Sequence, residues 1–258
     1  MKILSIGLGI FILTCAAGAE VFLETFDDRD IIEQWQELTI LNFGDGLPGP
    51  HSWEIVDGQL QSLIMGDERV THLFLIGDKE WQDYDIEVDV KPLRKHGPAH
   101  IAIASRIHQN QENQTWGVLC TIGDTPIPEP KSMALCFGRR LLDGDAFLHF
   151  EGKPYRSLSV GRWSHLKLSV HGKHLTFWIN GEQVLGPVTL EAKRFLVQER
   201  GFLFPDYPNG KVGFGVSNYA ALFDNLSITT GDNIPNPRGL AVTPRTKLAT
   251  TWGNLKQF

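Results

Sequence analysis

The sequence lacks the short motifs that mark the common classes of enzyme. It contains no Gly-x-Ser-x-Gly nucleophile elbow, no His-Glu-x-x-His metal motif, no phosphate-binding loop and no cysteine pair at zinc-finger spacing. It also lacks a basic stripe, and its 24 Lys and Arg against 30 Asp and Glu give a formal net charge of −6. Because nucleic acids and anionic membranes select for clustered Lys and Arg, this charge argues against both as partners.

Long apolar runs are missing from the chain after its first twenty residues. Within those residues, Lys2 precedes an apolar run over 3–14, and Ala17-Gly18-Ala19 offers the small residues that a signal peptidase accepts. The run is shorter than the ~20 apolar residues that a helix needs to span a bilayer. We therefore expect residues 1–19 to be a signal peptide and the mature chain to be secreted, periplasmic or at the cell surface. Two alternatives stay open, a lipoprotein acylated at Cys15 and a buried N-terminal strand or helix.

The rest of the chain consists of short runs rich in Val, Ile, Thr and aromatic residues, separated by Gly, Asp, Asn and Pro. Such runs are typical of β-strands bounded by turns. We expect strands over 59–64, 71–76, 84–90, 100–107, 115–122, 134–139, 146–150, 165–170, 175–179, 211–216 and 221–228. Strands and helices do not alternate, so the pattern predicts an all-β fold of two packed antiparallel sheets. A single helix is expected over 190–199, at one edge of the sandwich.

Alternating side chains indicate which face of a strand is buried. From Tyr84 to Val90 every second residue is apolar and is expected in the core, whereas Asp85, Glu87 and Asp89 are expected on the opposite face. Between two later strands, the pair Asn180-Gly181 predicts a hairpin with a type I′ turn.

Only three cysteines are present, and removal of residues 1–19 would leave two of them. Cys120 and Cys136 lie on two predicted strands joined by a proline-rich turn over 125–130. Each lies eight positions from Pro128, so a hairpin centred there places the two cysteines directly opposite each other. Opposed residues in a non-hydrogen-bonded antiparallel pair have Cα atoms ~4.5 Å apart, which is within disulfide range. We predict a Cys120–Cys136 disulfide, with two buried thiols as the alternative.

The character of the chain changes after residue 230. Residues 232–239 hold two prolines and no periodicity, which predicts a linker, and 240–258 are biased toward basic residues. We therefore expect one domain over 20–230, followed by a linker and C-terminal tail over 231–258. The tail is either flexible or a sorting or attachment element that docks to an envelope protein.

Seven segments follow one another in the order found in a known superfamily of β-sandwich proteins: 21–28, 53–60, 83–90, 161–168, 177–182, 210–216 and 222–228. In this order the chain resembles the concanavalin A-like lectin/glucanase superfamily, in particular the laminin-G-like jelly rolls and the bacterial domains called 3-keto-disaccharide hydrolases. The resemblance covers residues 21–230 and implies a two-sheet concanavalin-like jelly-roll sandwich, with the last strand returning beside the first. We expect Trp163 to plug one end of this sandwich. Function is implied less specifically, because the superfamily mixes lectins, hydrolases and adhesion modules.

One strand of the chain is similar to the catalytic strand of the family 16 glycoside hydrolases in that superfamily. Asp85, Glu87 and Asp89 alternate along it, and retaining hydrolysis needs two carboxyl groups ~5–5.5 Å apart. However, the order of the acids differs, and Lys91-Pro92 stands where a second glutamate is expected. We interpret the three acids as a solvated polar face and assign no catalytic residue.

A sugar-binding surface needs an aromatic platform and planar hydrogen-bonding groups. His100 and Arg106 alternate with two alanines, which predicts a shallow groove on one face of their strand. Trp116 and Arg139, on the next two strands, are expected to line the same face. The alternative is that Trp116 lies in the core and that Arg139 and its neighbour Arg140 pair with Asp143 or Asp145.

A structural calcium ion is a further possibility, although no cofactor is required. Glu24 lies in segment 21–28, which the resemblance implies is the first strand beside the last one, and Asp224 lies on that last strand; both offer oxygen ligands. The alternative is an ordinary polar pair.

These observations favour a secreted, non-catalytic module that binds a glycan or polysaccharide or acts in adhesion. The first alternative is a glycoside hydrolase of the 3-keto-disaccharide hydrolase type. The second is a structural domain of the cell envelope.

Overall fold

The computed structural model describes residues 20–41, 53–63, 70–109, 114–125, 131–141, 147–197 and 200–230. The expected signal peptide over 1–19 and the tail over 231–258 lie outside these residues, and both stay predictions. Among the described residues, no helix has the length and hydropathy needed to cross a bilayer.

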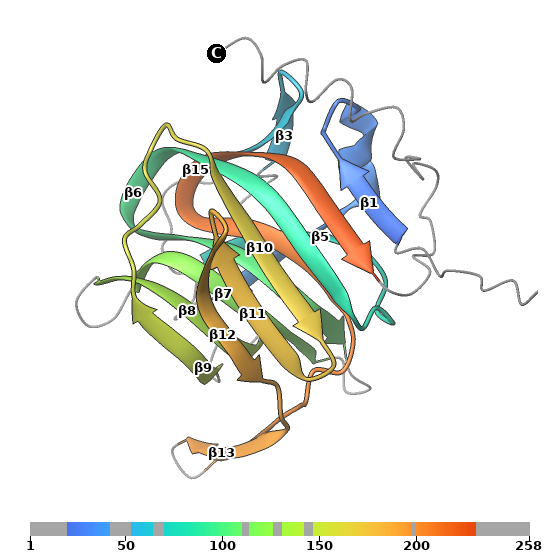
Figure 1. Ribbon diagram of the computed structural model, residues 1–258, viewed down its shortest axis with the longest axis vertical. Coiled ribbons are helices and arrows are strands. Elements are labelled where there is room, and N and C mark those ends of the chain that lie inside the picture. The colour runs from blue at the N-terminus through green and yellow to red at the C-terminus, as the bar shows by residue number, and fades with distance from the viewer. Residues whose placement is uncertain are drawn as a thin grey trace, which may run out of the picture.

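Two long strands, β6 (Tyr84–Gln109) and β15 (Lys211–Thr230), pair antiparallel along almost their whole length and run through both layers of the fold (Figure 1). The sequence predicted each as two separate strands. The register of the pair shifts at four places, and Asn218 at one of them has a positive φ of 59°. Because such bulges bend a strand, the pair curves from one layer into the other instead of ending.

The remaining strands attach to the two halves of this pair. The front sheet combines 100–109 of β6 and 211–217 of β15 with β2 (Gln36–Leu41), β5 (Val70–Ile76), β7 (Thr115–Thr125), β8 (Lys131–Arg140) and β9 (Phe147–Pro154). The back sheet combines 84–95 of β6 and 219–230 of β15 with β1 (Glu20–Glu24), β3 (Trp53–Val56), β4 (Gln59–Ser62), β10 (Ser164–His171), β11 (His174–Ile179) and β12 (Glu182–Thr189). This is the antiparallel jelly-roll sandwich that the sequence predicts, and β1 does pair with the end of β15.

The main core lies between the two sheets and is filled from both. On β6 the alternation expected from the sequence is confirmed, because Tyr84, Ile86, Val88 and Val90 are all fully buried. At one end of the core, Trp35 and Trp53 pack against the Phe74 ring, with centroids 4.8 and 5.4 Å away. Burial of rings of this size supplies a large part of the hydrophobic free energy of folding.

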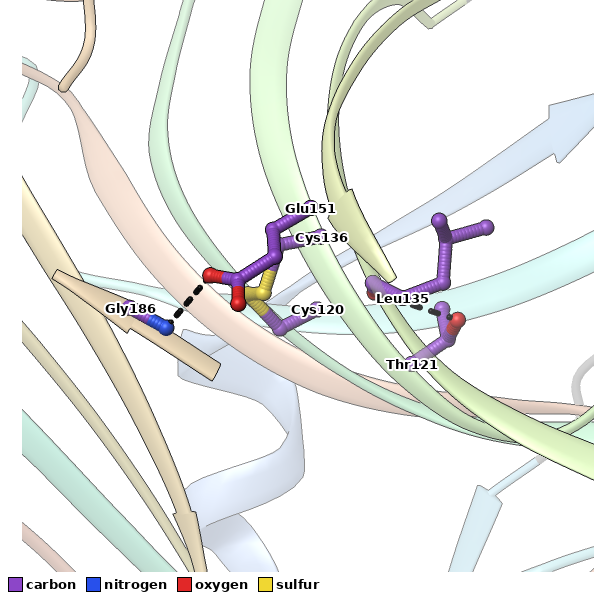
Figure 2. Close-up of a disulfide and its surroundings, with 6 residues drawn as sticks. All are labelled: Cys120, Thr121, Leu135, Cys136, Glu151 and Gly186. Carbon is purple, nitrogen blue, oxygen red and sulfur yellow. Dashed lines mark hydrogen bonds between the residues drawn. A yellow bond between two sulfur atoms is a disulfide. The ribbon is translucent and has the colours of Figure 1, made fainter. Parts of the chain in front are cut away.

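The two cysteines are joined by the disulfide that the sequence predicts (Figure 2). Cys120 on β7 lies directly opposite Cys136 on β8, with their Cα atoms 4.1 Å apart. Beside them, the Glu151 carboxylate of β9 accepts a hydrogen bond from the backbone N–H of Gly186 on β12, at 2.7 Å. This bond links the edge of the front sheet to the edge of the back sheet.

The hairpin between β11 and β12 has the turn that its sequence indicates. Asn180 and Gly181 both have positive φ, 52° and 79°, as a type I′ turn requires. The Asn180 side chain accepts the backbone N–H of His165 at 2.8 Å, which secures the neighbouring strand β10.

The prediction of a helix over 190–199 is wrong. The chain instead forms β13 (Lys193–Val197), which pairs with β14 (Arg200–Phe204) in a hairpin that stands away from the sandwich in Figure 1. Pairing of two runs rich in Phe, Leu and Val prevails over the sparse helical spacing of apolar residues on which the prediction was based. The described residues also include a short 3-10 helix, η1 (Arg29–Gln34), which was not predicted from the sequence.

Candidate functional site

The four residues predicted to line one groove are separated by the fold. His100 and Arg139 lie on the outer face of the front sheet, the face turned away from the main core. There the Thr71 hydroxyl lies 2.9 Å from Nε2 of His100. Burial, together with the positive charge of Arg139, lowers the pKa of His100 to about 4. The imidazole is therefore neutral at neutral pH and can both donate and accept a hydrogen bond.

Arg106 does not share that face. The pairing of β6 with β7 shifts register between Ser105 and His108, and Arg106 has a positive φ of 54°. This bulge places Ile107, instead of Arg106, beside the alanines of the outer face. The Arg106 guanidinium is 1% exposed and donates to the carbonyl oxygens of Tyr207, Pro208 and Gly172. It ties three segments of the sandwich together and is not available to a ligand.

Trp116 lies in the main core, which is the alternative that the sequence analysis left open. Its ring packs edge-on against Phe204, with centroids 5.6 Å apart, and is only 5% exposed. It cannot offer a ring face to a sugar.

The prediction of a shallow groove at the two alanines is also wrong. Ala102 and Ala104 are fully buried in a second apolar cluster on the outer face of the front sheet. Its members are Ile40, Leu73, Leu75, Ala102, Ala104, Ile107, Leu119 and Leu141. A Cβ added at Gly213 would collide with the Leu75 side chain. The leucine therefore covers the space that the glycine leaves open. The space beside these small residues is therefore occupied by larger apolar side chains and does not form a groove.

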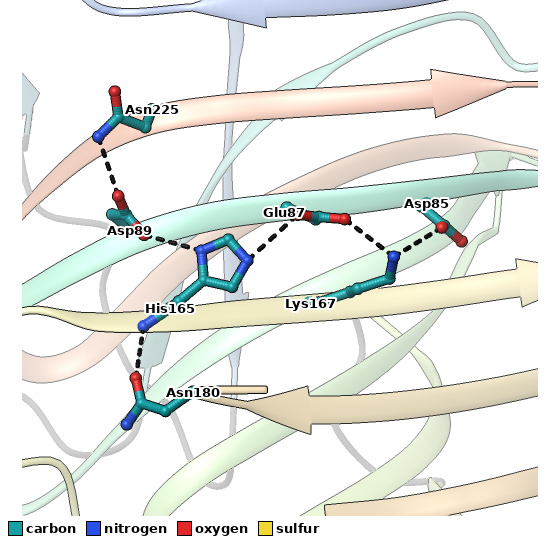
Figure 3. Close-up of polar contacts among 7 residues, drawn as sticks. All are labelled: Asp85, Glu87, Asp89, His165, Lys167, Asn180 and Asn225. Atoms are coloured by element: carbon teal, nitrogen blue, oxygen red, sulfur yellow. Dashed lines mark hydrogen bonds and ion pairs between the residues drawn. The ribbon is translucent and has the colours of Figure 1, made fainter. Parts of the chain in front are cut away.

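The outer face of the back sheet is different, because it carries a row of alternating charges (Figure 3). His165 of β10 lies between two carboxylates of β6, with Nδ1 2.8 Å from Asp89 and Nε2 3.2 Å from Glu87. Lys167, two residues on, lies between Glu87 and Asp85 at 2.9 and 2.8 Å. We call these five side chains the charge ladder.

Each member of the charge ladder faces its partner because β6 and β10 pair in register. His165 is opposite Asp89, and Lys167 is opposite Glu87. At one end of the ladder, the Asn225 amide donates to the second oxygen of Asp89 at 2.9 Å. The acids on β6 are thus held in fixed positions, partly exposed to solvent, as the sequence interpretation of a solvated polar face expects.

The electrostatics of the charge ladder keep His165 and Glu87 ionised at neutral pH. Hydrogen bonds to Asp89 and Glu87 raise the pKa of His165 to about 9, and the bond from His165 lowers the pKa of Glu87 to about 2. Efficient general acid–base catalysis needs a pKa near the working pH. Neither group meets that condition at neutral pH.

Two tryptophans lie on the same face as the charge ladder, and the sequence analysis did not propose either as a site residue. Trp178 of β11 is opposite Lys167, whose ammonium lies 5.7 Å from the ring centroid. Trp163 directly precedes β10, and the Lys91 ammonium lies 5.9 Å from its ring centroid. The alternation of β10 could have identified Trp163, because it falls two residues before His165 and so on the same side.

The sequence predicted that Trp163 plugs one end of the sandwich, and this prediction is wrong. The next residue, Ser164, is buried, so the strand directs Trp163 outward, where it is 41% exposed. Together with Trp178, it gives the outer face of the back sheet two aromatic surfaces. We call Trp163, Trp178, Lys91, Asn225 and the charge ladder the back-sheet face.

The two residues predicted to hold calcium lie on paired strands. Glu24 is opposite Leu226, close along β15 to Asp224. The Glu24 carboxylate accepts the N–H of Phe26 at 2.6 Å, and burial, with the nearby charges of Asp89 and Asp27, raises the pKa of Asp224. Among the described ranges, no group of three or more His, Cys, Asp or Glu side chains is arranged to hold a metal ion. Calcium binding at this pair stays a prediction.

Comparison with known proteins agrees with the fold. A Bacillus subtilis protein of unknown function with a galectin-like fold has a TM-score of 0.52 and is 12% identical, over 82% of this chain and 96% of that one. The carbohydrate binding module CBM66 from Bacillus subtilis has a TM-score of 0.49 and is 14% identical, over 76% and 95% of the two chains. No curated protein matches the sequence. The model of the 3-keto-alpha-glucoside-1,2-lyase-like domain matches residues 22–229, and the chain therefore belongs to that family.

Proposed function

We propose that this protein binds carbohydrate without cleaving it and that the back-sheet face is its binding surface. The observation that carries the proposal is the presence of two partly exposed tryptophans, Trp163 and Trp178, beside a fixed row of polar side chains. Membership of a family named for keto-glucosides supports a carbohydrate as the ligand.

The chemistry of this surface suits a sugar. An indole ring offers an apolar surface against which the apolar face of a sugar ring can pack. Carboxylate, amide and imidazole groups can then exchange hydrogen bonds with the hydroxyls. Because the charge ladder already holds these groups in place, little side-chain entropy would be lost on binding.

A binding role is favoured over a catalytic role at this face by its protonation states. His165 and Glu87 have pKa values of about 9 and about 2 and stay ionised at neutral pH. Each is also held by the other at 3.2 Å. Proton donation to a leaving group would require breaking these contacts first.

The test is titration calorimetry of the wild type and of a Trp178→Ala variant against a panel of soluble oligosaccharides. We expect at least one saturable ligand and a loss of about fivefold or more in affinity in the variant, since a stacked aromatic contact contributes ~1 kcal/mol or more. Leu203→Ala removes another exposed apolar side chain, on the β13–β14 hairpin, and serves as the matched control. Binding that is lost on His100→Ala but kept in Trp178→Ala would move the site to the front sheet and overturn this placement.

A second candidate function is cleavage of a keto-glucoside, and the family match is the observation that favours it. Incubating the protein with 3-keto-disaccharides and ordinary glycosides, and following product formation, separates the two. Turnover would favour the enzyme, whereas saturable binding without turnover would favour the binding module. If both are absent, a structural role in the envelope is left.

We also propose that the protein works outside the cytoplasm. The apolar N-terminal segment predicts export, and the Cys120–Cys136 disulfide fits an oxidising compartment. Mass spectrometry of the mature chain, together with fractionation of the native host, tests this. A protein that begins at Met1 and stays in the cytosol would contradict it.

A further inference from the structure

One end of the back-sheet face differs from the rest in its charge. In the charge ladder, each cation has carboxylate partners, such as Asp85 and Glu87 around Lys167. Lys91 and Arg162, next to Trp163, have no ion-pair partner within the part of the chain that the structure describes. Two cations here are therefore not neutralised, although the chain as a whole carries a formal net charge of −6.

The fold holds these groups together. The backbone N–H of Gly161 donates to the carbonyl of Pro92 at 2.7 Å, which fixes the loop before β10 against β6. Because Ser164 is opposite Val90, the residue before it, Trp163, lies beside Lys91. The ammonium over the indole at 5.9 Å confirms this contact, and Arg162, which directly precedes Trp163 in the chain, is exposed.

A ligand for this corner must have an apolar face for the indole and a negative charge for the cations. The Lys91 ammonium has three N–H donors and no acceptor, and the Arg162 guanidinium presents a planar fork that suits a carboxylate. A sugar ring that carries a carboxylate has both properties. A neutral sugar would use the indole but leave the two cations without a counter-ion.

We propose that Lys91, Arg162 and Trp163 form a subsite for an acidic sugar unit, so that the ligand is a glycan bearing carboxylates. This inference rests on the proposed function, because it names the class of carbohydrate that the back-sheet face takes. The carboxylate binds to Lys91 and Arg162 while the ring packs on Trp163, and neighbouring units extend over the charge ladder toward Trp178.

An anionic lipid surface would share the negative charge but not the surroundings of the corner. The apolar side chains exposed there are Val160 and Trp163, at 54% and 41% exposure. Trp163 lies two residues before His165 and so borders the hydrogen-bonding groups of the charge ladder, which suit sugar hydroxyls and not acyl chains. A polyhydroxylated ligand therefore fits the corner better than a bilayer does.

The experiment compares oligogalacturonate with its methyl ester, which has the same sugar chain without the charge. Titration calorimetry on the full chain should show tighter binding of the acid by about fivefold or more, the effect of ~1 kcal/mol from exposed charge pairs. The Lys91→Gln/Arg162→Gln double variant should remove this preference. Lys193→Gln changes an exposed lysine on β13 and is the matched control. Salt at 0.5 M should weaken binding of the acid more than binding of the ester.

The outcomes separate this inference from the proposed function. Equal affinity for acid and ester, a preference that survives in the double variant, or no binding of oligogalacturonate would each overturn the acidic subsite. Neutral oligosaccharides that bind in a Trp178-dependent manner would still support the proposed function in all three cases. Trp163-dependent binding to phosphatidylglycerol vesicles, without binding to acidic sugars, would overturn the subsite in favour of a membrane surface.

Discussion

The outer faces of the two sheets have opposite characters, although the sheets share two strands. On the front sheet, Ala102 and Gly213 are covered by larger apolar neighbours. On the back sheet, the same strand β6 carries Asp85, Glu87 and Asp89, which are partly exposed and paired with cations. A face of small residues is therefore not by itself a sign of a binding groove. A face of fixed, partly exposed polar groups beside aromatic rings is the better indication.

The largest expected effect concerns the packing of the front sheet. A Cβ at Gly215 would collide with the backbone carbonyl of His72, and a backbone atom cannot move aside easily. We expect Gly215→Ala to lower the free energy of unfolding by about 3 kcal/mol or more, measured by denaturant titration. Gly181→Ala is the control, because that position has open space and only a positive φ of 79°, with an expected cost of about 1 kcal/mol. Similar costs for both would show that the front sheet is not tightly packed.

The disulfide is expected to come next in size. Cys120 and Cys136 are 16 positions apart in the sequence, and closing a loop of that length stabilises by about 3 kcal/mol in the chain-entropy model. We expect the Cys120→Ala/Cys136→Ala variant to lose about that much stability and to be insensitive to a reducing agent, which should destabilise the wild type. An unchanged melting temperature in the variant would show that the bond contributes nothing to the front sheet.

The charge ladder predicts a smaller effect that depends on pH. The folded pKa of His165, about 9, is higher than its ordinary value, so its contribution is fully present below pH 6.5 and is lost as the pH rises through 9. Because the side chain is 41% exposed, solvent screening limits that contribution to about 1 kcal/mol. We expect His165→Gln to cost that amount at pH 5.5 and almost nothing at pH 10, measured by urea titration. An equal cost at both pH values would mean that the ladder acts through packing alone.

The smallest expected effect is that of calcium between Glu24 and Asp224. If an ion binds there, EDTA should lower the Tm by about 2 °C, and added calcium should restore it. Glu24→Gln/Asp224→Asn should remove this sensitivity. No change in melting with EDTA would leave the carboxylates as an ordinary polar pair.

Much of the fold could be predicted because local signals determine it. The β7–β8 hairpin follows from two cysteines placed symmetrically about Pro128, and Asn180-Gly181 specifies the turn of the separate β11–β12 hairpin. The continuity of β6 and β15 could not be predicted, because bulges in both strands bend the chain where a turn was expected. No local pattern distinguishes such a bend from a strand end.

The candidate site was harder to predict for a related reason. One bulge at Arg106 changes the direction of every later side chain on β6, and simple alternation cannot anticipate it. The prediction put Trp116 in the groove from the order of the strands alone. The sequence does not show which face of its strand is covered by the second sheet. By contrast, Trp178 alternates with the buried Phe177 and Ile179 in a strand predicted correctly, so its outward direction could have been inferred.

The shared strands have a consequence for how the domain comes apart. Since β6 and β15 form the middle of both sheets, neither sheet can lose these two strands without dismantling the other (Figure 1). We therefore expect the sandwich to unfold as a single cooperative unit, with both layers lost in one transition on heating or in denaturant. Amide protons along the β6–β15 pair should exchange with solvent only on global unfolding, whereas those of the β13–β14 hairpin exchange through local opening.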